Sequence, residues 1–178
     1  MRRLPGDLTQ QQDVERMIRV DHAGEYGAMR IYAGQLAVMR GSARRDMVKH
    51  MADQEKQHFD KFDSLIRDRR VRPTALMPLW HVAGFALGAA SALLGEKAAM
   101  ACTVAVETVI NDHYNAQKER LGDHEKELGD TIEKFRQEEM EHHDIAMENG
   151  AEQAPLYGAL SFGVKTASKL AIWLSTRL

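Results

Sequence analysis

The sequence has almost none of the residue types that cross-link or divide a chain. Cys102 is the only cysteine among 178 residues, so the chain can form neither an internal disulfide nor a thiolate metal site, and a reducing compartment fits. No stretch rich in proline, glycine and serine separates two parts of the chain. We therefore expect one domain, residues 1–178, in which any metal ion is held by oxygen and nitrogen atoms.

The sequence also lacks an excess of positive charge. Its 24 lysines and arginines are mixed with 26 acids, for a net charge of −2, and they form no basic stripe. We therefore do not expect nucleic acid as a partner. The first sixteen residues, "MRRLPGDLTQQQDVER", lack a signal peptide's apolar core and hold too many acids for a typical mitochondrial transit peptide. They predict a bacterial protein or an already processed mature chain.

No segment alternates between apolar and polar residues over a useful length, so we predict an all-α fold. Apolar residues instead recur at steps of three and four, which is helical spacing. The segments with this spacing are residues 14–39, 45–69, 97–121 and 128–146. Each of these apolar faces is interrupted by acidic side chains.

The interrupting residues form a repeated pattern. They are Glu25, the pair Glu55 and His58, Glu107, and the pair Glu139 and His142. In each half a single glutamate is followed about thirty residues later by Glu-x-x-His, whose two side chains share one helix face. This pattern is typical of a carboxylate-bridged two-metal site in a four-helix bundle, and its ligands suit iron or manganese. Asp21, one turn before Glu25, is a candidate for orienting a ligand histidine.

Charge balance supports a metal site. Four carboxylates in an apolar bundle would each face a desolvation cost of several kcal/mol, and would take up protons unless cations neutralised them. Two divalent ions would balance the four negative charges. Two Glu-x-x-His pairs alone are weak evidence; the inward faces and matched intervals make the prediction specific. In "QEEMEHHD" (137–144) we expect Glu139 and His142 to point inward and Glu138, Glu141 and His143 to be solvated or to support the ligands; Asp144 is left open.

Two segments are apolar enough to meet a membrane. Residues 73–95 carry no formal charge over twenty-three positions, and 156–178 repeat the theme with flanking lysines. The first is long enough to span a bilayer, but Pro78 and His81 interrupt it and much of the remainder is alanine, glycine and serine. Composition leaves two readings open: helices that dip into a bilayer surface, or helices that complete the core. Apolar surface on 73–95 also suggests a homo-oligomer or a lipid-presenting partner protein.

Five blocks of the sequence resemble the demethoxyubiquinone hydroxylase family in order along nearly the whole chain. They are "RVDHAGEYGAMRIYAGQLAV" (19–38), "DQEKQHFDKF" (53–62), "RPTALMPLWHVAGFALGAASALLG" (72–95), "ACTVAVETVINDHYNAQ" (101–117) and "FRQEEMEHHDIA" (135–146). The resemblance implies a ferritin-like four-helix bundle with an apolar crossover and an extra C-terminal helix, associated with a membrane. It places the metal ligands at the same six positions as the helical spacing does.

The resemblance also implies an activity. Enzymes of this family add a ring hydroxyl to a demethoxyubiquinol in ubiquinone biosynthesis, with two iron ions, O₂ and, we expect, NADH as electron donor. The implied partners are a polyprenyl quinone, the membrane surface and other ubiquinone-biosynthesis proteins. The implied location is peripheral, on the cytoplasmic face of a bacterial inner membrane or the matrix face of the mitochondrial one.

Two neighbouring residues of the third predicted helix are candidates for catalysis. The resemblance suggests that His113 and Tyr114 lie near the path of electrons or of the quinone; the alternative is a hydrogen-bonded histidine and a packed aromatic ring. Thr108 departs from the family pattern, where we expect a glutamate. Because Thr108 is not an expected ligand, the departure concerns the tuning of the site.

Two other functions share parts of this pattern. A ferritin-like protein that binds or oxidises iron would use similar ligands, although the long apolar crossover argues against a soluble storage shell. A non-enzymatic, membrane-associated lipid-binding bundle would leave the acids solvated. Iron content and quinone-dependent O₂ consumption distinguish these alternatives from a hydroxylase.

Overall fold

Six α-helices and one short 3-10 helix make up the structure, a computed structural model that describes residues 8–178. The α-helices are α1 (Gln10–Val38), α2 (Arg45–Asp68), α3 (Met77–Leu93), α4 (Glu96–Leu121), α5 (Lys126–Glu148) and α6 (Tyr157–Ser175), and the 3-10 helix is η1 (Ala151–Gln153). No strand occurs in this part of the chain, which confirms the all-α prediction. Residues 1–7 lie outside the described residues. They belong to the N-terminal stretch in which the sequence predicts neither a signal peptide nor a transit peptide.

The helix ends follow local chemistry. Thr9 caps α1: its hydroxyl accepts a hydrogen bond from the Gln12 amide, and the Gln12 side chain accepts one from the Thr9 amide. α4 ends at Gly122, whose φ of 53° most other residues adopt only at a cost. The four helices predicted from amphipathic spacing begin and end within a few residues of the predicted bounds.

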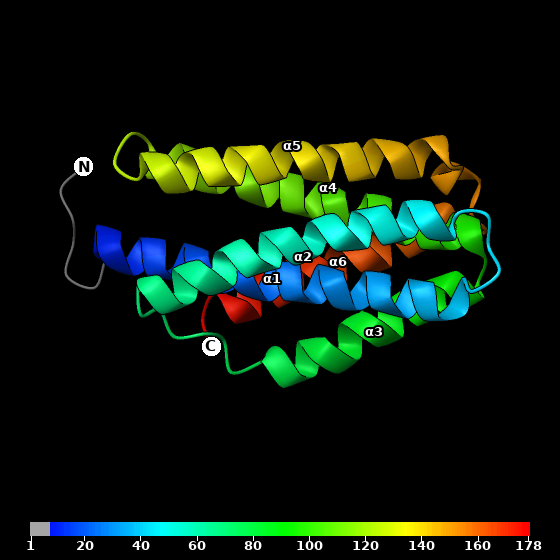
Figure 1. Cartoon of the computed structure of the whole chain (residues 1–178), viewed down its shortest axis with the longest axis horizontal. Helices are drawn as coiled ribbons and strands as arrows, with labels where there is room; N and C mark the ends of the chain where they lie inside the picture. Colours follow the sequence, from blue (N-terminus) through cyan, green and yellow to red (C-terminus); the bar gives the residue numbers. More distant parts are fainter. Residues whose placement is uncertain (1–7) are drawn as a thin grey trace.

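Consecutive helices run in opposite directions and lie roughly along one long axis (Figure 1). α1 packs against α2, and α4 packs against α5, which gives two antiparallel pairs. Ile18, Phe62, Leu128 and Ile132 join these pairs in an apolar core at one end of the helices. A second core at the other end includes Met51, Met100 and Ala146. The buried polar groups described below lie between these two cores.

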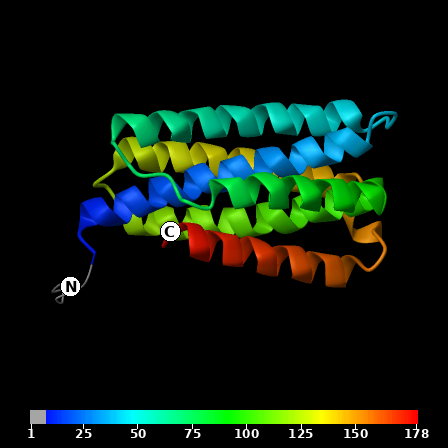
Figure 2. The same ribbon diagram turned by 90° about the horizontal axis from the view of Figure 1, so that it is seen from below.

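The remaining helices, α3 and α6, cover one side of this arrangement, as the view from below shows (Figure 2). α3 packs closely along α1, and α6 packs on α4. The chain end returns to the start of α3, where the Ala75 amide donates to the Leu178 carbonyl at 3.2 Å. Among residues 8–178, no helix has the length and apolar character needed to cross a membrane.

Candidate metal centre

Six buried carboxylate and imidazole groups from four helices meet in one cluster. They are the six residues that the helical spacing predicts: Glu25 on α1, Glu55 and His58 on α2, Glu107 on α4, and Glu139 and His142 on α5. Each is at most 3% exposed. They fall into two overlapping groups, in each of which one donor atom per residue lies within 4.8 Å of the others. Glu55 and Glu139 belong to both groups.

One group contains Glu25 and His58, and the other contains Glu107 and His142. Nδ1 of His58 lies 3.0 Å from Oε1 of Glu139, and Nδ1 of His142 lies 3.2 Å from Oε2 of the same carboxylate. The Nδ1 atoms of both rings therefore face the middle of the cluster. Spacing of i, i+3 on α2 and α5 brings each histidine beside its own glutamate.

The two single glutamates are held by tyrosines in a reciprocal arrangement. Tyr32 of α1 donates its hydroxyl hydrogen bond to Oε1 of Glu107 on α4 at 3.1 Å. Tyr114 of α4 donates to Oε1 of Glu25 on α1. Each tyrosine follows the glutamate of its own helix by seven residues, or two turns. The repeated Glu-x₆-Tyr spacing is the sequence signal for this arrangement.

The outer nitrogens of the two histidines are held by residues that sequence analysis did not assign to them. Nε2 of His58 lies 2.8 Å from Oε2 of Glu138, and Nε2 of His142 lies 3.0 Å from Oε1 of Gln54. Gln54 and Glu138 each directly precede the glutamate of one Glu-x-x-His pair, and each reaches the histidine of the other pair. The partners differ in charge, so the His58 side of the cluster carries one more carboxylate.

Burial and mutual repulsion dominate the electrostatics of the carboxylates. Desolvation, with added repulsion from Glu139, raises the pKa of Glu55 and Glu107 well above the usual range. Burial also raises the pKa of Glu25, against the opposing effect of His58. Burial acts in the same direction on Glu139, but hydrogen bonds from His142 and His58 prevail and lower its pKa to about 2. Four acids in one buried cluster therefore hold their charge only beside cations.

The histidines respond to these acids. Burial opposes the charge on His58, yet hydrogen bonds with Glu139 and Glu25 raise its pKa to about 12. The pKa of His142 is also raised, by Glu139 and Glu107 against burial. Among residues 8–178 neither buried oxygen of Glu55 has a hydrogen-bond partner, although Nδ1 of His142 lies 3.3 Å from Oε1. A buried carboxylate without donors, in a set of four carboxylates and two imidazoles, fits the requirements of two divalent cations.

His113 and Tyr114, the two predicted catalytic residues, occupy different environments. Tyr114 is buried against Glu25, and burial together with the charge of Glu25 raises its pKa well above 10, so its hydroxyl stays protonated. His113 is partly exposed, and its Nε2 lies 3.2 Å from Oδ1 of Asp21. Asp21 therefore contacts His113 and, at 2.7 Å, the amide of Gln117, instead of the ligand histidine that we expected. The rings of His113 and Tyr114 lie 6.2 Å apart, measured between their centroids, and the charge of Asp21 also raises the pKa of Tyr114.

The charged stretch 137–144 divides between the interior and the surface. Glu139 and His142 point inward, and Glu138 supports His58, whereas Glu141 is exposed. His143 pairs with Asp144 at the surface, with Nδ1 and Oδ1 2.9 Å apart. Thr108 makes no contact with the cluster, because its hydroxyl donates to the Val104 carbonyl of its own helix at 2.7 Å. Its role in tuning the site stays a prediction.

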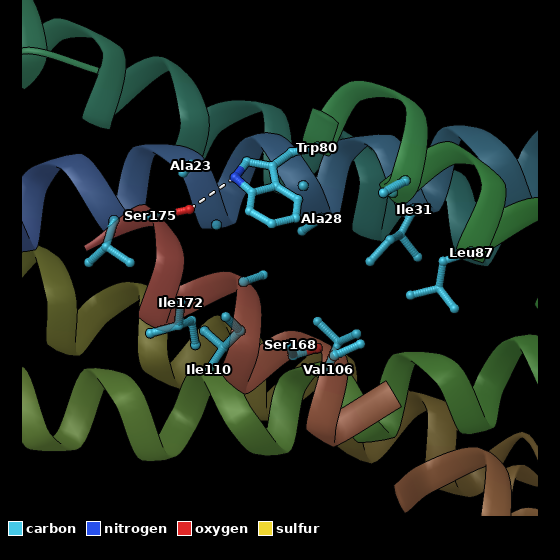
Figure 3. A pocket seen from close by; sticks show the side chains of 17 residues that line it. Ala23, Ala28, Ile31, Trp80, Leu87, Val106, Ile110, Ser168, Ile172 and Ser175 are labelled. Carbon is cyan, nitrogen blue, oxygen red and sulfur yellow. Dashed lines mark hydrogen bonds between the residues drawn. The ribbon is translucent and has the colours of Figure 1, made fainter. Parts of the chain in front are cut away.

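An apolar cavity lies beside the cluster, between α1, α3, α4 and α6 (Figure 3). Its volume is about 260 Å³. Gly24 and Val106 line it, and each directly precedes a glutamate of the cluster. At the edge of the cavity the Trp80 indole donates to the Ser175 hydroxyl at 2.9 Å. The cavity and the cluster thus share the walls formed by α1 and α4.

This fold and this cluster define a class of protein: an all-helical chain whose buried glutamates and histidines form two overlapping groups, each of which could hold a metal ion. Residues 12–175 match the family model described as "Ubiquinone biosynthesis protein COQ7". The chain therefore belongs to the COQ7 family, which confirms the resemblance seen in the sequence motifs.

Individual relatives carry related names. The 3-demethoxyubiquinol 3-hydroxylase of Rhodospirillum rubrum is 58% identical over 177 residues, which cover 99% of this chain and 84% of that protein. Two proteins are each named "NADPH-dependent 3-demethoxyubiquinone 3-hydroxylase, mitochondrial". That of Dictyostelium discoideum is 58% identical over 94% of this chain and 78% of its own length. That of Homo sapiens is 54% identical over 93% and 78%, respectively. The chain is thus a member of an enzyme family whose named members are hydroxylases.

These names correct one expectation. NADH, which we expected as the electron donor, is wrong, because the relatives from Dictyostelium discoideum, Bos taurus and Homo sapiens are named as NADPH-dependent. The two dinucleotides differ only in a ribose 2′-phosphate, and our sequence analysis had identified no residue that binds either one. The choice of NADH rested on the family resemblance alone.

Proposed function

We propose that this protein is a 3-demethoxyubiquinol 3-hydroxylase with a di-iron centre. The observation that carries the proposal is the buried cluster of four glutamates and two histidines beside an apolar cavity, in a member of the COQ7 family. The whole chain, residues 1–178, would form one ferritin-like domain, with α1, α2, α4 and α5 as the bundle. The family favours a hydroxylase over an iron-storage protein or a non-enzymatic lipid carrier.

The proposed reaction replaces one ring C–H bond of the quinol by C–OH. One atom of O₂ enters the ring, and the other leaves as water with two electrons and two protons. The names of the relatives support NADPH as the source of these electrons. When bound, the two irons supply the activation of O₂, which the side chains of this protein cannot perform themselves.

The side chains of the cluster would bind and orient the two irons. Glu55 and Glu139, which belong to both groups, would bridge them, and Glu25, His58, Glu107 and His142 would complete the ligand set. Tyr32 and Tyr114 hold the single glutamates through hydrogen bonds, and Glu138 and Gln54 hold the outer nitrogens of the histidines. Such supporting contacts fix ligand orientation and raise ligand basicity.

His113 and Tyr114 have separate proposed roles. Tyr114 stays protonated and holds Glu25 in place, so it acts on the centre directly. His113 is the partly exposed member of a hydrogen-bonded set with Asp21 and Gln117, on the same two helices as Glu25 and Glu107. We place His113 on the route by which electrons or protons reach the cluster from the surface.

The apolar cavity would hold the part of the quinone next to the reacting ring. Its walls are formed by residues such as Ile31, Leu87, Val106 and Ile110, and Figure 3 shows their side chains around one common space. A volume of about 260 Å³ is too small for a long polyprenyl quinone, so most of the tail would leave the protein. The cavity lies between α3 and α6, and the exposed surface of these helices would receive the tail.

The surface of α3 and α6 would bind a membrane. Among the described residues, every exposed large apolar side chain lies on these helices or within three residues of their ends. They are Leu79, Val82, Phe85, Leu93, Leu94, Leu156, Phe162, Leu170, Trp173 and Leu178. Exposed apolar side chains gathered on two helices suit the acyl region of a bilayer. We propose peripheral attachment, to the cytoplasmic face of a bacterial inner membrane or the matrix face of a mitochondrial one.

The same apolar surface would also meet proteins. A homo-oligomer or a lipid-presenting partner protein would cover it away from the membrane, and other ubiquinone-biosynthesis proteins would exchange quinone intermediates with it. The test is whether purified protein forms a higher-order species that disperses when a non-ionic detergent is added. A species that persists in detergent would show that another surface makes the contact.

The central experiment is turnover with a defined substrate. Iron-loaded protein is incubated with O₂, NADPH and a demethoxyubiquinol analogue, and the product is identified by mass. We expect a gain of one oxygen atom, labelled when ¹⁸O₂ is used. Iron oxidation without quinol hydroxylation would instead support the storage alternative. Quinone binding by a protein that takes up no iron would support the lipid-binding alternative.

A further inference from the structure

The glycines of α1 and α3 near the cavity are of two kinds. Gly34 and Gly88 lie where the two helices touch: a Cβ on Gly88 would overlap the Ile31 carbonyl, and one on Gly34 would overlap the Phe85 carbonyl. A Cβ on Gly84 would lie only 2.9 Å from the Gly27 carbonyl oxygen. The close approach of the backbones therefore requires glycine at these positions.

Gly24 and Gly27 have no such requirement. A Cβ built on either would meet no heavy atom within 4 Å. Both lie in the interior of α1, and neither has a positive φ. Alanine would fit the backbone at both positions, and glycine in a helix interior is less stable than alanine. Neither the conformation nor the packing of the protein explains these two glycines.

What the two glycines share is the cavity. Both line it, near the middle of the α1 face that runs from Val20 to Ile31. The facing wall of α6 also presents small side chains, Ala167, Ser168 and Ala171. Gly24 directly precedes Glu25, so this part of the wall lies at the same level as the proposed metal ligands. The missing side chains widen the cavity where a substrate would come nearest to the cluster.

We propose that Gly24 and Gly27 determine the substrate specificity of the cavity by leaving space for the quinone against the backbone of α1. The ring or first isoprene unit occupies the volume that two methyl groups would otherwise fill. The glycines lower the stability of α1 in exchange for this space. The proposal rests on the proposed function for the identity of the ligand, but its geometric basis is independent of the reaction.

The test measures stability and binding in the same variants. In a Trp173→Phe background Trp80, which lines the cavity, is the only tryptophan, so its fluorescence reports an occupant. Gly27→Ala is titrated with a benzoquinone that carries a decyl tail. We expect the melting temperature to rise by up to about 2–4 °C. The dissociation constant should rise roughly tenfold, as overpacking by one methyl group does elsewhere.

Three further variants sharpen the result. Gly24→Ala should behave as Gly27→Ala does, and Gly27→Leu, which fills more of the cavity, should weaken binding further. Gly129→Ala on α5 is the matched control: its Cβ also meets nothing within 4 Å, but Gly129 lies away from the cavity. It should leave the dissociation constant unchanged. Uptake of Co(II), followed by absorption, should be the same in Gly27→Ala as in the parent protein.

The outcomes separate this proposal from the proposed function. Unchanged quinone binding in both Gly27→Ala and Gly27→Leu would overturn the role of the glycines, even if the parent protein hydroxylates the quinol. Weaker binding in these variants would support that role, even if the parent protein shows no hydroxylation. For an active parent, the substitutions should raise KM for the quinol more than they lower kcat. A fall in kcat alone would contradict a role in substrate accommodation.

Discussion

Charged groups usually lie at the surface of a protein and large apolar groups inside it, and two regions of this molecule depart from that rule in opposite ways. Helices α1, α2, α4 and α5 bury six ionisable side chains between them, whereas α3, α6 and the residues next to their ends expose ten large apolar ones. Each arrangement is unfavourable for the isolated chain in water. Each becomes favourable with a particular partner: cations in the first case and an apolar phase in the second. The cavity lies where the two regions meet, and there the proposed lipid-soluble substrate would bind.

Loss of a shared ligand should have the largest effect on the charged region. Glu139→Ala removes a carboxylate that belongs to both groups of the cluster, so turnover should fall by at least about 100-fold. Product formation by mass spectrometry measures the loss. Glu141→Ala, on the exposed side of the same helix, is the matched control and should keep near-normal turnover. A Glu139→Ala protein with normal turnover would remove the cluster from the mechanism.

Because Glu138 is charged and Gln54 is not, the two halves of the cluster should differ in their affinity for a metal ion. Glu138→Gln replaces the carboxylate at Nε2 of His58 by an amide, and we expect the affinity for the metal ion on that side to fall roughly tenfold. Gln54→Glu should have the opposite effect at His142. Titration with Mn(II), followed by electron paramagnetic resonance, distinguishes the binding of one ion in each half of the cluster. Identical titrations of both variants and the parent would show that these partners do not affect the metal.

A charge on the apolar side should weaken attachment to lipid. Phe162 on α6 is 73% exposed, and burial of such a side chain contributes about 1.5–3 kcal/mol. Phe162→Asp should therefore reduce binding to liposomes roughly tenfold or more in a flotation assay. Gln137→Asp adds the same charge to exposed α5 and should leave flotation unchanged. Equal flotation of all three proteins would mean that α6 does not face the bilayer.

The metal-free protein should lose stability as pH rises from about 5 to 8. Folding raises the pKa of Glu55 and Glu107, so the folded state binds more protons than the unfolded state above the unfolded pKa of about 4.5. His58 acts in the same direction above pH 6.5, because its pKa in the folded state is about 12. Melting temperatures should fall by a few degrees across this range without metal. A rising melting temperature would show that the cluster does not bind these protons.

Metal should remove most of this dependence, since cations replace the protons as the counter-charges. The loaded protein should therefore melt at similar temperatures at pH 6 and pH 8. If the melting temperature fell equally with pH in the presence and absence of Co(II), the ion would bind outside the cluster. Above about pH 6, Glu139 contributes little slope, because it is ionised both in the folded state, where its pKa is about 2, and in the unfolded state, where its pKa is about 4.5.

Helical periodicity was sufficient to predict the main helices and the residues of the cluster. Glu25 and Glu107 interrupt apolar faces, and i, i+3 spacing places each histidine beside its glutamate. The pattern within a single helix is therefore enough to identify each of these residues. The contacts of Glu138 with His58 and of Gln54 with His142 depend on how α2 and α5 pack. Nothing in the spacing of one helix indicates which neighbour a side chain reaches, and for the same reason the partner of Asp21 was predicted wrongly.

The cavity was also beyond sequence analysis. Gly24, Gly27, Gly34 and Gly84 look alike in a sequence, and only the positions of neighbouring atoms distinguish glycines that allow helix contact from those that leave space. The nicotinamide electron donor was not predictable for another reason. None of the motifs that we identified in the sequence binds a dinucleotide. The helices and the residues of the cluster follow from local periodicity, whereas the cavity and the supporting contacts follow from packing.

We propose that the buried carboxylates and histidines of α1, α2, α4 and α5 hold two metal ions. The decisive experiment is an anaerobic titration of metal-free protein with Fe(II), in which bound iron is measured per chain. We expect saturation at about two ions per chain, and a clear loss of bound iron in Glu55→Ala, whose native carboxylate has no hydrogen-bond partner among the described residues. Negligible binding by the parent protein, or the same saturation in Glu55→Ala, would contradict it.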